Sequence, residues 1–229
     1  MVLSVVIPVL NEEKALPSLL EQIACWDCVD EVVFVDGGSA DATMALLDGQ
    51  KVLSCKDGRG AQCRLGAECA QGDALVFVHA DSSISADAMR AIRAALESGV
   101  AWGCLTLRFE SRALSMRFAA RASNLRVRLS GIPFGDQVMF MTREIYEQVG
   151  GMPDLALMED YELSRRLRSI IWPKQLREKV YTSPRRFERG GSVRTMLQMH
   201  HLRHLYRKGV DVQQLAREYS KSKGQVYGE

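Results

Sequence analysis

Two carboxylates in the first half of the chain stand directly behind short apolar runs. Asp36 follows the run at 31–35 and opens an Asp-Gly-Gly-Ser turn that closes at Ser39. Asp81 follows the run at 74–78 and closes a His-Ala-Asp sequence that opens at His79. Carboxylate oxygens hold Mg²⁺ or Mn²⁺ and accept hydrogen bonds from ribose or base groups. One such turn is common and indicates little, but a succession of them favours a polar site, in which His79 either binds or packs.

Glu159 and Asp160 form a second carboxylate centre, in the sequence Met-Glu-Asp-Tyr-Glu-Leu at 158–163. A general base must lie within hydrogen-bond reach of the hydroxyl that it deprotonates, and a carboxylate can take that role. Acidic residues in the first turn of a helix are also favoured by the helix dipole. A catalytic and a purely structural role therefore both stay open for this pair on spacing alone.

A glycine-flanked arginine, Arg59, stands in the sequence Asp-Gly-Arg-Gly-Ala-Gln at 57–62, ahead of a predicted helix. The amides of a helix N-terminus and a guanidinium both suit a phosphate or a base carbonyl. The segment lacks the glycine spacing of a dinucleotide-binding loop, and the sequence contains no GxxxxGK[ST] phosphate loop. These observations disfavour a dehydrogenase and an ATPase.

Short apolar runs alternate along the chain with segments that have apolar residues at helical spacing. Strands are expected at 4–9, 31–35, 74–78, 101–109 and 138–141, with a short one near 52. Helices are expected behind Asn11 as a cap, from about 41, at 61–70, 85–97, 114–129 and 158–168, and again from 193. This order predicts an α/β fold with a mainly parallel sheet. Because ligands of such sheets bind beyond the carboxyl ends of the strands, the polar turns should share one edge.

The bulk composition is that of an ordinary globular chain of 229 residues, with 47% hydrophobic and 25% charged residues. The net charge of +2 gives no reason to expect nucleic acid as a partner. Two stretches, 111–135 and 185–208, are locally basic, which suits phosphates or acidic lipids, or else a solvated helix face. No basic leader and no run of ~18 apolar residues is visible. We therefore expect a cytoplasmic protein that is at most peripheral to a membrane.

Cysteine and histidine pairs offer two further metal candidates. Cys25 and Cys28 have CxxC spacing, but no second spaced pair accompanies them, so we expect free packing thiols in preference to a zinc or redox site. His200 and His204 would share a helix face, next to His201. They form either part of a metal shell or, more simply, a basic helix face.

Seven segments together resemble the glycosyltransferase family 2 enzymes of the GT-A fold, in particular their small bacterial members. These segments are Val-Ile-Pro-Val-Leu-Asn-Glu at 6–12, Val-Phe-Val-Asp-Gly-Gly-Ser-Ala-Asp at 33–41, Gly-Arg-Gly-Ala-Gln at 58–62, Phe-Val-His-Ala-Asp at 77–81, Phe-Gly-Asp-Gln at 134–137, Gly-Gly-Met-Pro at 150–153 and the sequence at 158–163. They cover most of residues 2–190 in the order that the family has. The resemblance is specific for the family and not for any sugar.

The resemblance implies a role for each matching residue. Those expected at the nucleotide are Pro8, Asn11, Glu12, Asp36, Ser39, Arg59, Gln62 and Asp81. Asp81 matches the last acid of the family's DxD motif and would bind Mg²⁺ or Mn²⁺, while His79 replaces the first acid and would join it at the metal, touch the ribose or pack. Asp160 matches the catalytic base, with Glu159 beside it. The sugar and acceptor side would hold Gly135, Asp136 and Gln137, with Arg185 and Arg186 as clamps for a phosphate.

The function that the resemblance implies is inverting, metal-assisted transfer of a sugar from a nucleotide-sugar, by family habit a UDP-sugar, to a hydroxyl acceptor that could be lipid-linked. Residues 1–229 would form one domain, with a nucleotide-binding half up to about 105 and an acceptor-side half with C-terminal helices beyond it. Two alternatives stay open. A sugar nucleotidyltransferase usually has a glycine-rich basic loop after its first strand, where this chain has Leu-Asn-Glu-Glu at 10–13. A non-catalytic nucleotide-sugar-binding protein would have no need of both Asp81 and Asp160.

Overall fold

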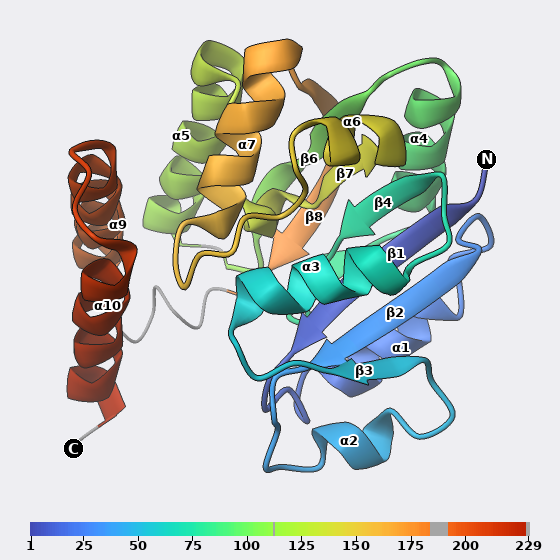
Figure 1. The fold of residues 1–229 in the computed structure, drawn as a ribbon, viewed down its shortest axis with the longest axis horizontal. Coiled ribbons are helices and arrows are strands. Elements are labelled where there is room, and N and C mark those ends of the chain that lie inside the picture. The colour runs from blue at the N-terminus through green and yellow to red at the C-terminus, as the bar shows by residue number, and fades with distance from the viewer. Residues whose placement is uncertain (112, 184–191, 228–229) are drawn as a thin grey trace.

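A computed structural model describes residues 1–111, 113–183 and 192–227 and shows one eight-stranded sheet between helices (Figure 1). The strand order is β3-β2-β1-β4-β7-β6-β8-β5. The strands are β1 (Leu3–Val9), β2 (Glu31–Asp36), β3 (Val52–Ser54), β4 (Ala74–Phe77), β5 (Ser82–Ile84), β6 (Trp102–Phe109), β7 (Met139–Thr142) and β8 (Lys174–Thr182). Pairing is parallel from β3 through β4 and between β6 and β8, and antiparallel where β7 and β5 join.

The helices lie on both faces of the sheet and at one side of it. They are α1 (Leu16–Ile23), α2 (Thr43–Leu46), α3 (Arg59–Cys69), α4 (Ala86–Glu97), α5 (Leu114–Ser130), α6 (Arg143–Gln148), α7 (Glu159–Ile170), α9 (Ser192–Arg207) and α10 (Val212–Tyr227). In Figure 1, α3 crosses in front of the strands, and α9 and α10 stand together beside the sheet. This arrangement confirms the α/β fold with a mixed, mainly parallel sheet.

Alternation along β1 explains how the sheet holds helices on both faces, since successive side chains of a strand point to opposite sides. Ile7 and its odd-numbered neighbours belong to one buried cluster together with residues of α1 and α4. Val6 belongs to a second cluster, with residues of α3, α6 and α7. At Gly66 a Cβ would lie 2.4 Å from Val6 Cγ1, so only glycine lets α3 pack this close to the sheet. Burial on both faces is why β1 is apolar apart from Ser4.

A third apolar cluster joins the C-terminal helices to the rest of the molecule. Its buried members are Ile132, Met158, Tyr161, Leu202 and Leu215, so α9 and α10 pack on the start of α7 and the segment ahead of β7. Within the described ranges, no helix is both long and apolar enough to cross a membrane.

The strand directions bring the polar turns together. β1, β2 and β4 are parallel, β6 runs antiparallel to β7 and therefore parallel to β4, and β8 is parallel to β6. The carboxyl ends of all five strands consequently meet at one edge, as the sequence predicted for the first three.

Candidate active site

The loops behind β1 and β2 are joined to each other by side-chain hydrogen bonds. The Asn11 N–H donates to Ser39 Oγ at 2.9 Å, and Asn11 Oδ1 accepts from the Ala40 N–H at 2.8 Å. The Glu12 N–H donates to Thr43 Oγ1 at 2.8 Å. Asn11 therefore couples two loops and does not cap the first helix, which begins at Leu16; that part of the prediction was wrong.

Asp36 and Gln62 stabilise the same edge of the sheet through hydrogen bonds to the backbone. Asp36 is 5% exposed, and its carboxylate accepts from the N–H groups of Gly38 at 2.8 Å and Ser39 at 3.2 Å, which closes the turn. Gln62 Nε2 donates to the carbonyls of Val9 at 3.0 Å and Val35 at 2.7 Å. These contacts give both residues a structural task at the ends of β1 and β2. Pro8 is buried within β1.

The strongest polar cluster joins the start of α3 to the start of α7. Arg59 Nε and its terminal nitrogen both lie 2.5 Å from Glu159 Oε1, and the terminal nitrogen is 3.9 Å from Asp160 Oδ2. Gly60 permits this approach, because a Cβ there would be 3.0 Å from the Leu155 carbonyl and 3.1 Å from Glu159 Cβ. The Gly-Arg-Gly sequence is therefore explained by close packing around an ion pair.

Burial dominates the electrostatics of this cluster. Glu159 is 3% exposed, and burial raises the pKa of its carboxyl against the lowering influence of Arg59. The Arg59 side chain is 44% exposed, and partial burial would lower the pKa of its guanidinium, but the charges of Glu159 and Asp160 raise it overall. The ionised form of Glu159 thus depends on Arg59, while the like charge of Asp160 works against it.

Asp160 is fixed by two backbone N–H groups. Gly135 donates to Asp160 Oδ2 at 2.9 Å, and Tyr161 donates to Oδ1 at 2.7 Å. Its side chain is 20% exposed, so a carboxylate of defined orientation still reaches the surface. That combination suits a base, which must be held and yet accessible.

His79 lies against Gly135 beside this carboxylate. A Cβ on Gly135 would be 2.7 Å from His79 Nε2 and 3.4 Å from Asp160 Oδ2, so both side chains lie close against Gly135. Burial lowers the pKa of His79 to about 3, with a further lowering by Arg59 that Asp160 opposes. The imidazole is therefore neutral at physiological pH.

Asp81 is half-buried between the end of β4 and the start of β5. Among the described residues, no group of three His, Cys, Asp or Glu side chains is placed to hold a metal. One carboxylate with a neutral imidazole two residues earlier fits Mg²⁺ or Mn²⁺ only where substrate phosphates and water supply most of the ligands, as is usual for Mg²⁺. The donor set is compatible with a metal that arrives with the diphosphate.

Gln137 belongs to a buried network between the 3₁₀ turn Gly135–Gln137 and α5. Its Oε1 accepts from Arg126 at 2.9 Å, and its Nε2 lies 3.3 Å from Asn124 Oδ1. Burial lowers the pKa of Arg126 to about 10, and the charge of Asp136 opposes this. Gln137 thus positions the turn from within, whereas Asp136 is half-buried.

Two arginines of α9 meet aromatic rings in this region, and the sequence did not predict these contacts. The Phe134 ring contacts two guanidiniums: its centroid lies 3.5 Å from Arg126 Cζ and 5.0 Å from Arg203 Cζ. Arg207 Nε donates to the Tyr161 hydroxyl at 2.7 Å. The sequence showed that the stretches 111–135 and 185–208 are basic, but it did not show which of their arginines point into the molecule.

Backbone strain marks the same region. The described residues contain three non-glycine positions with positive φ, at Asn11 (55°), Val138 (54°) and Met158 (70°). Asn11 is itself a predicted site residue, Val138 follows Gln137, and Met158 precedes Glu159. A β-branched residue in this conformation is a true outlier, and such strain tends to gather at functional sites.

Several predicted residues lie elsewhere. Arg185 and Arg186 fall outside the described residues. Cys25 is exposed and Cys28 half-buried, both as free thiols, and burial raises the pKa of Cys28. His200, His201 and His204 are exposed on α9.

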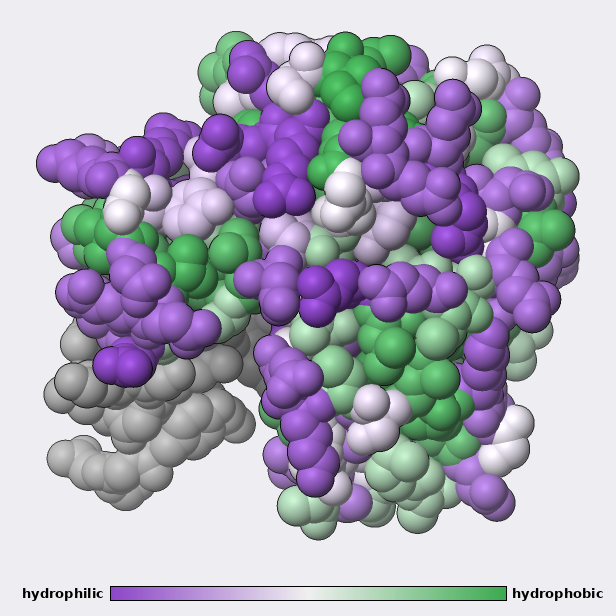
Figure 2. Space-filling model, viewed as in Figure 1, coloured by the Kyte–Doolittle hydropathy of each residue, from purple (hydrophilic) through white to green (hydrophobic). Residues whose placement is uncertain are grey.

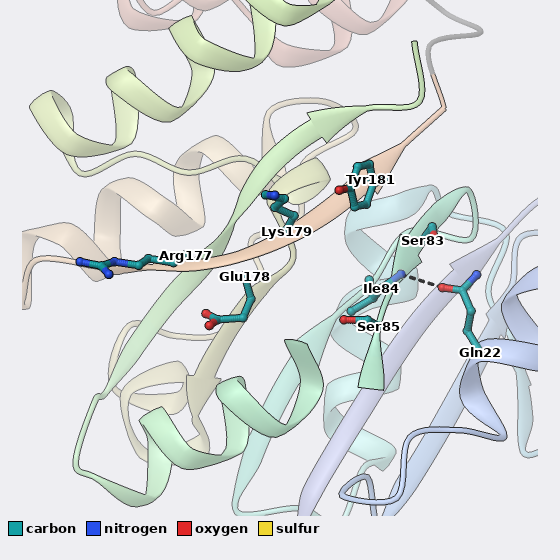
Figure 3. Close-up of a pocket in the computed structure, with 8 residues that line it drawn as sticks. All are labelled: Gln22, Ser83, Ile84, Ser85, Arg177, Glu178, Lys179 and Tyr181. Atoms are coloured by element: carbon teal, nitrogen blue, oxygen red, sulfur yellow. Dashed lines mark hydrogen bonds between the residues drawn. The ribbon is translucent and has the colours of Figure 1, made fainter. Parts of the chain in front are cut away.

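A surface pocket lies apart from all predicted site residues, where α1 meets β5 and β8 (Figure 3). It is lined by Gln22, Ser83, Ile84, Ser85, Arg177, Glu178, Lys179 and Tyr181. Gln22 Oε1 accepts from the Ile84 N–H at 2.6 Å and so ties α1 to β5. The pocket is a feature of the sheet edge and shares no residue with the cluster around Asp160.

Comparison with known families places the chain in one of them. Residues 4–150 match the model of the family described as glycosyl transferase family 2. The chain belongs to this family. A PGL/p-HBAD biosynthesis glycosyltransferase of Mycobacterium bovis is 35% identical over 91 residues, which cover 35% of this chain and 36% of the relative. An undecaprenyl-phosphate 4-deoxy-4-formamido-L-arabinose transferase of Aeromonas hydrophila is 37% identical over 92 residues, covering 34% of this chain and 28% of the relative. The matches thus span about a third of these proteins.

Solved structures of glycosyltransferases show the same GT-A fold. S. aureus TarS 1–349 in complex with UDP-GlcNAc superposes with a TM-score of 0.64 at 18% identity, over 80% of this chain and 58% of TarS. Glucosyl-3-phosphoglycerate synthase from Mycobacterium tuberculosis, in complex with Mg²⁺ and UDP, gives a TM-score of 0.60 at 20% identity, over 78% of this chain and 69% of that chain. At these identities the likeness concerns the fold.

Proposed function

We propose that the chain is an inverting glycosyltransferase that moves a sugar from a nucleotide-sugar to an acceptor hydroxyl, with Asp160 as the base. The observation that carries this proposal is the cluster in which Arg59 and Glu159 flank an oriented, partly accessible Asp160 at the carboxyl edge of the sheet. A UDP-sugar donor is supported by the UDP and UDP-GlcNAc named in complexes of proteins with the same fold.

In the proposed transfer step, Asp160 would accept the proton of the acceptor hydroxyl. Its carboxylate takes the acceptor O–H proton while the oxygen forms a bond to the anomeric carbon. The bond from that carbon to the diphosphate breaks at the opposite face, and the nucleoside diphosphate leaves with the electron pair. Attack from the opposite face inverts the anomeric configuration. The Gly135 and Tyr161 N–H groups hold Asp160 in position throughout.

Residues at the strand ends would bind the donor. Asn11, Glu12, Asp36 and Ser39 shape the coupled loops behind β1 and β2, and Asp81, with His79 nearby, would hold Mg²⁺ or Mn²⁺. Such an ion neutralises charge on a diphosphate leaving group. Residues 1–105 would thus form the donor half, and the segment at 134–137 with the C-terminal helices would face the acceptor. A lipid-linked acceptor is supported by the undecaprenyl-phosphate in the name of the Aeromonas relative.

The first experiment combines donor binding with turnover. We expect Asp160→Asn to lower the rate of nucleoside diphosphate release about 10²–10⁴-fold, because it removes proton transfer, while the donor still binds. Binding is measured by the thermal shift with nucleotide diphosphates and their sugars, with and without Mn²⁺; a ligand at about 100 times its Kd adds about 2.7 kcal/mol. Asp81→Asn should lose the metal-dependent part of that shift.

Asp154→Asn is the matched control, because Asp154 lies in the same segment as Asp160 but its side chain is 70% exposed and paired with Arg64 at 3.4 Å. Full turnover of Asp160→Asn would contradict the assigned base. Pyrophosphate release from a nucleoside triphosphate would favour the nucleotidyltransferase instead. Donor binding without turnover by the wild-type protein, across the acceptor panel, would favour a non-catalytic binder.

A further inference from the structure

Helix α5 exposes a continuous apolar stripe. Leu114, Phe118, Leu125 and Leu129 are 77%, 69%, 53% and 73% exposed. At about 100° per residue these four positions fall within about 60° of the helix circumference, along nearly its whole length. Large apolar side chains gathered on one face indicate a partner, whereas scattered ones do not.

A basic stripe runs beside the apolar one. Arg117, Arg121 and Arg128 are exposed and fall within about 40° of each other on the helix, directly next to the apolar stripe. No acidic residue occurs from 111 to 135. The opposite face of α5 is buried and anchors it to the body through Met116, Ala119, Ala120 and Val127. The outer face is therefore apolar and cationic at once.

The surface continues beyond the C-terminal end of α5. Ile170, Ile171 and Trp172, at the end of α7, are 46%, 46% and 48% exposed. Trp172 adjoins the end of α5, since a Cβ on Gly131 would lie 3.3 Å from Trp172 Cδ2. In Figure 2, hydrophobic side chains reach the surface among hydrophilic ones at the top of the view, over the ends of α5 and α7.

A groove at this junction adds polar and cationic groups. Arg128 of α5 and Arg177 of β8 line it together with Trp172, Thr106 and Gln175. Arg128 Nε donates to Gln175 Oε1 at 3.3 Å, which keeps its guanidinium at the groove. Two arginines and an indole at the border of an apolar stripe match a phosphodiester headgroup above acyl chains.

The charge on this face distinguishes between two candidate partners, a second copy of the chain and a lipid bilayer. In a symmetric contact between two copies of the chain, the arginine stripe of one would meet the arginine stripe of the other, at an unfavourable electrostatic cost. An anionic bilayer meets both stripes favourably: arginines at the headgroups and apolar side chains at the acyl boundary. At about 25 Å, α5 is long enough to lie in that interface.

We propose that α5, with residues 170–172, docks the protein on the surface of an anionic phospholipid membrane. α5 follows β6, whose carboxyl end lies at the edge that holds Asp160, so the Leu114 end of the docked helix lies at the site edge. An acceptor carried by lipid would then be presented beside the proposed base. The link to an acceptor rests on the proposed function, whereas docking itself does not.

The test is vesicle flotation of the full chain at low salt. We expect binding to vesicles of phosphatidylcholine with 30–40% phosphatidylglycerol, and little binding to pure phosphatidylcholine. The triple variant Arg117→Gln, Arg121→Gln, Arg128→Gln should lower the partition coefficient on the order of a hundredfold. Phe118→Glu with Leu129→Glu should lower it at least about tenfold through the apolar contact.

Matched controls lie away from α5. Lys14→Gln, Lys208→Gln, Arg217→Gln removes the same charge from exposed positions, and Met44→Glu with Leu46→Glu changes two exposed apolar residues on α2. Both should bind like wild type. Failure of the wild type to bind anionic vesicles, equal loss in the controls, or a dimer in sedimentation that Phe118→Glu dissolves would overturn the proposal. Because flotation needs no turnover, its outcome is independent of the transfer assay.

Discussion

Gly135 determines the geometry of the proposed base by having no side chain. Its N–H holds Asp160, and the space that a Cβ would need is taken by His79 Nε2 at 2.7 Å and approached by Asp160 Oδ2 at 3.4 Å. The residue has no positive φ, so close approach and not backbone conformation requires glycine here. A single methyl group would press on both neighbours.

We therefore predict that Gly135→Ala lowers kcat at least about tenfold, since small misplacements of a catalytic group are costly. Overpacking of a tight site should also cost about 1–3 kcal/mol of unfolding free energy. Steady-state kinetics and urea denaturation measure the two effects. Gly99→Ala serves as the control, because it introduces strain at φ +92° in open space and should lose about 1 kcal/mol without loss of kcat. Equal kcat losses in both variants would contradict the local explanation.

At the scale of elements, the apolar strands and amphipathic helices were predictable from the sequence, and β8 and β5 were not. β1 and β4 are buried throughout and read as nearly unbroken apolar runs, whereas β8 is mostly polar or charged over 174–179 and has only two buried positions, Val180 and Thr182, at its end. β5 has three residues, Ser82–Ile84, too few for a periodic pattern. The strands that close the sheet are thus set by pairing with distant residues, which local sequence does not encode.

The candidate site, like the sheet, was predictable only in part from the sequence. The polar turns behind β1, β2 and β4 share an edge because parallel strands must share one, so residues such as Asp36 and Asp81 could be placed from the pattern. The pairing of Arg59 with Glu159 depends on the close approach of the two segments at Gly60, and local sequence does not say which residues meet there. The contact of Phe134 with both Arg126 and Arg203 depends on how α9 packs, and composition alone could not reveal it.

Glu31, at the start of β2, joins three other segments of the chain through hydrogen bonds to its carboxylate. Its Oε2 accepts from Ser4 Oγ at 2.5 Å and from the Gln71 N–H at 2.8 Å, and its Oε1 accepts from Lys51 Nζ at 2.6 Å. Burial opposes ionisation, but these three hydrogen bonds outweigh it and hold the pKa of Glu31 below its ordinary 4.5. The ionised form is therefore the stabilising one.

We predict that Glu31→Gln lowers the unfolding free energy by about 1–2 kcal/mol at pH 7. Because the folded-state pKa is lowered, the wild-type advantage is fully present above pH 4.5 and is lost as pH falls through the lower folded-state value. Urea denaturation of both proteins across this range tests the sign. Glu147→Gln, whose side chain is 65% exposed and lies 4.0 Å from Arg143, should change little. A wild-type advantage that grows on acidification would contradict the assignment.

At the scale of the molecule, the three apolar clusters should contribute unequally to the free energy of unfolding. Two of them lie on opposite faces of the sheet and share its strands, so they should unfold together. The third joins α9 and α10 to α7 through few buried residues, aided by the Tyr206 hydroxyl, which donates to Glu162 Oε2 at 3.0 Å. Few apolar contacts indicate a unit that opens at lower free energy than the sheet.

The C-terminal helices should therefore detach while the sheet stays folded. Leu215 is fully buried, and we predict that Leu215→Ala, which leaves a cavity in the third cluster, speeds amide hydrogen exchange in α9 and α10 by at least about tenfold. Amides of β1 and β4 should keep their exchange rates, because their pairing and both sheet clusters are intact. Leu105→Ala, in the first cluster, is the contrasting variant and should lower protection across the strands. Hydrogen exchange read by mass spectrometry separates these outcomes. Faster exchange in β1 and β4 of Leu215→Ala would mean that the helices and the sheet unfold as one unit, and that the proposed acceptor side is as rigid as the donor half.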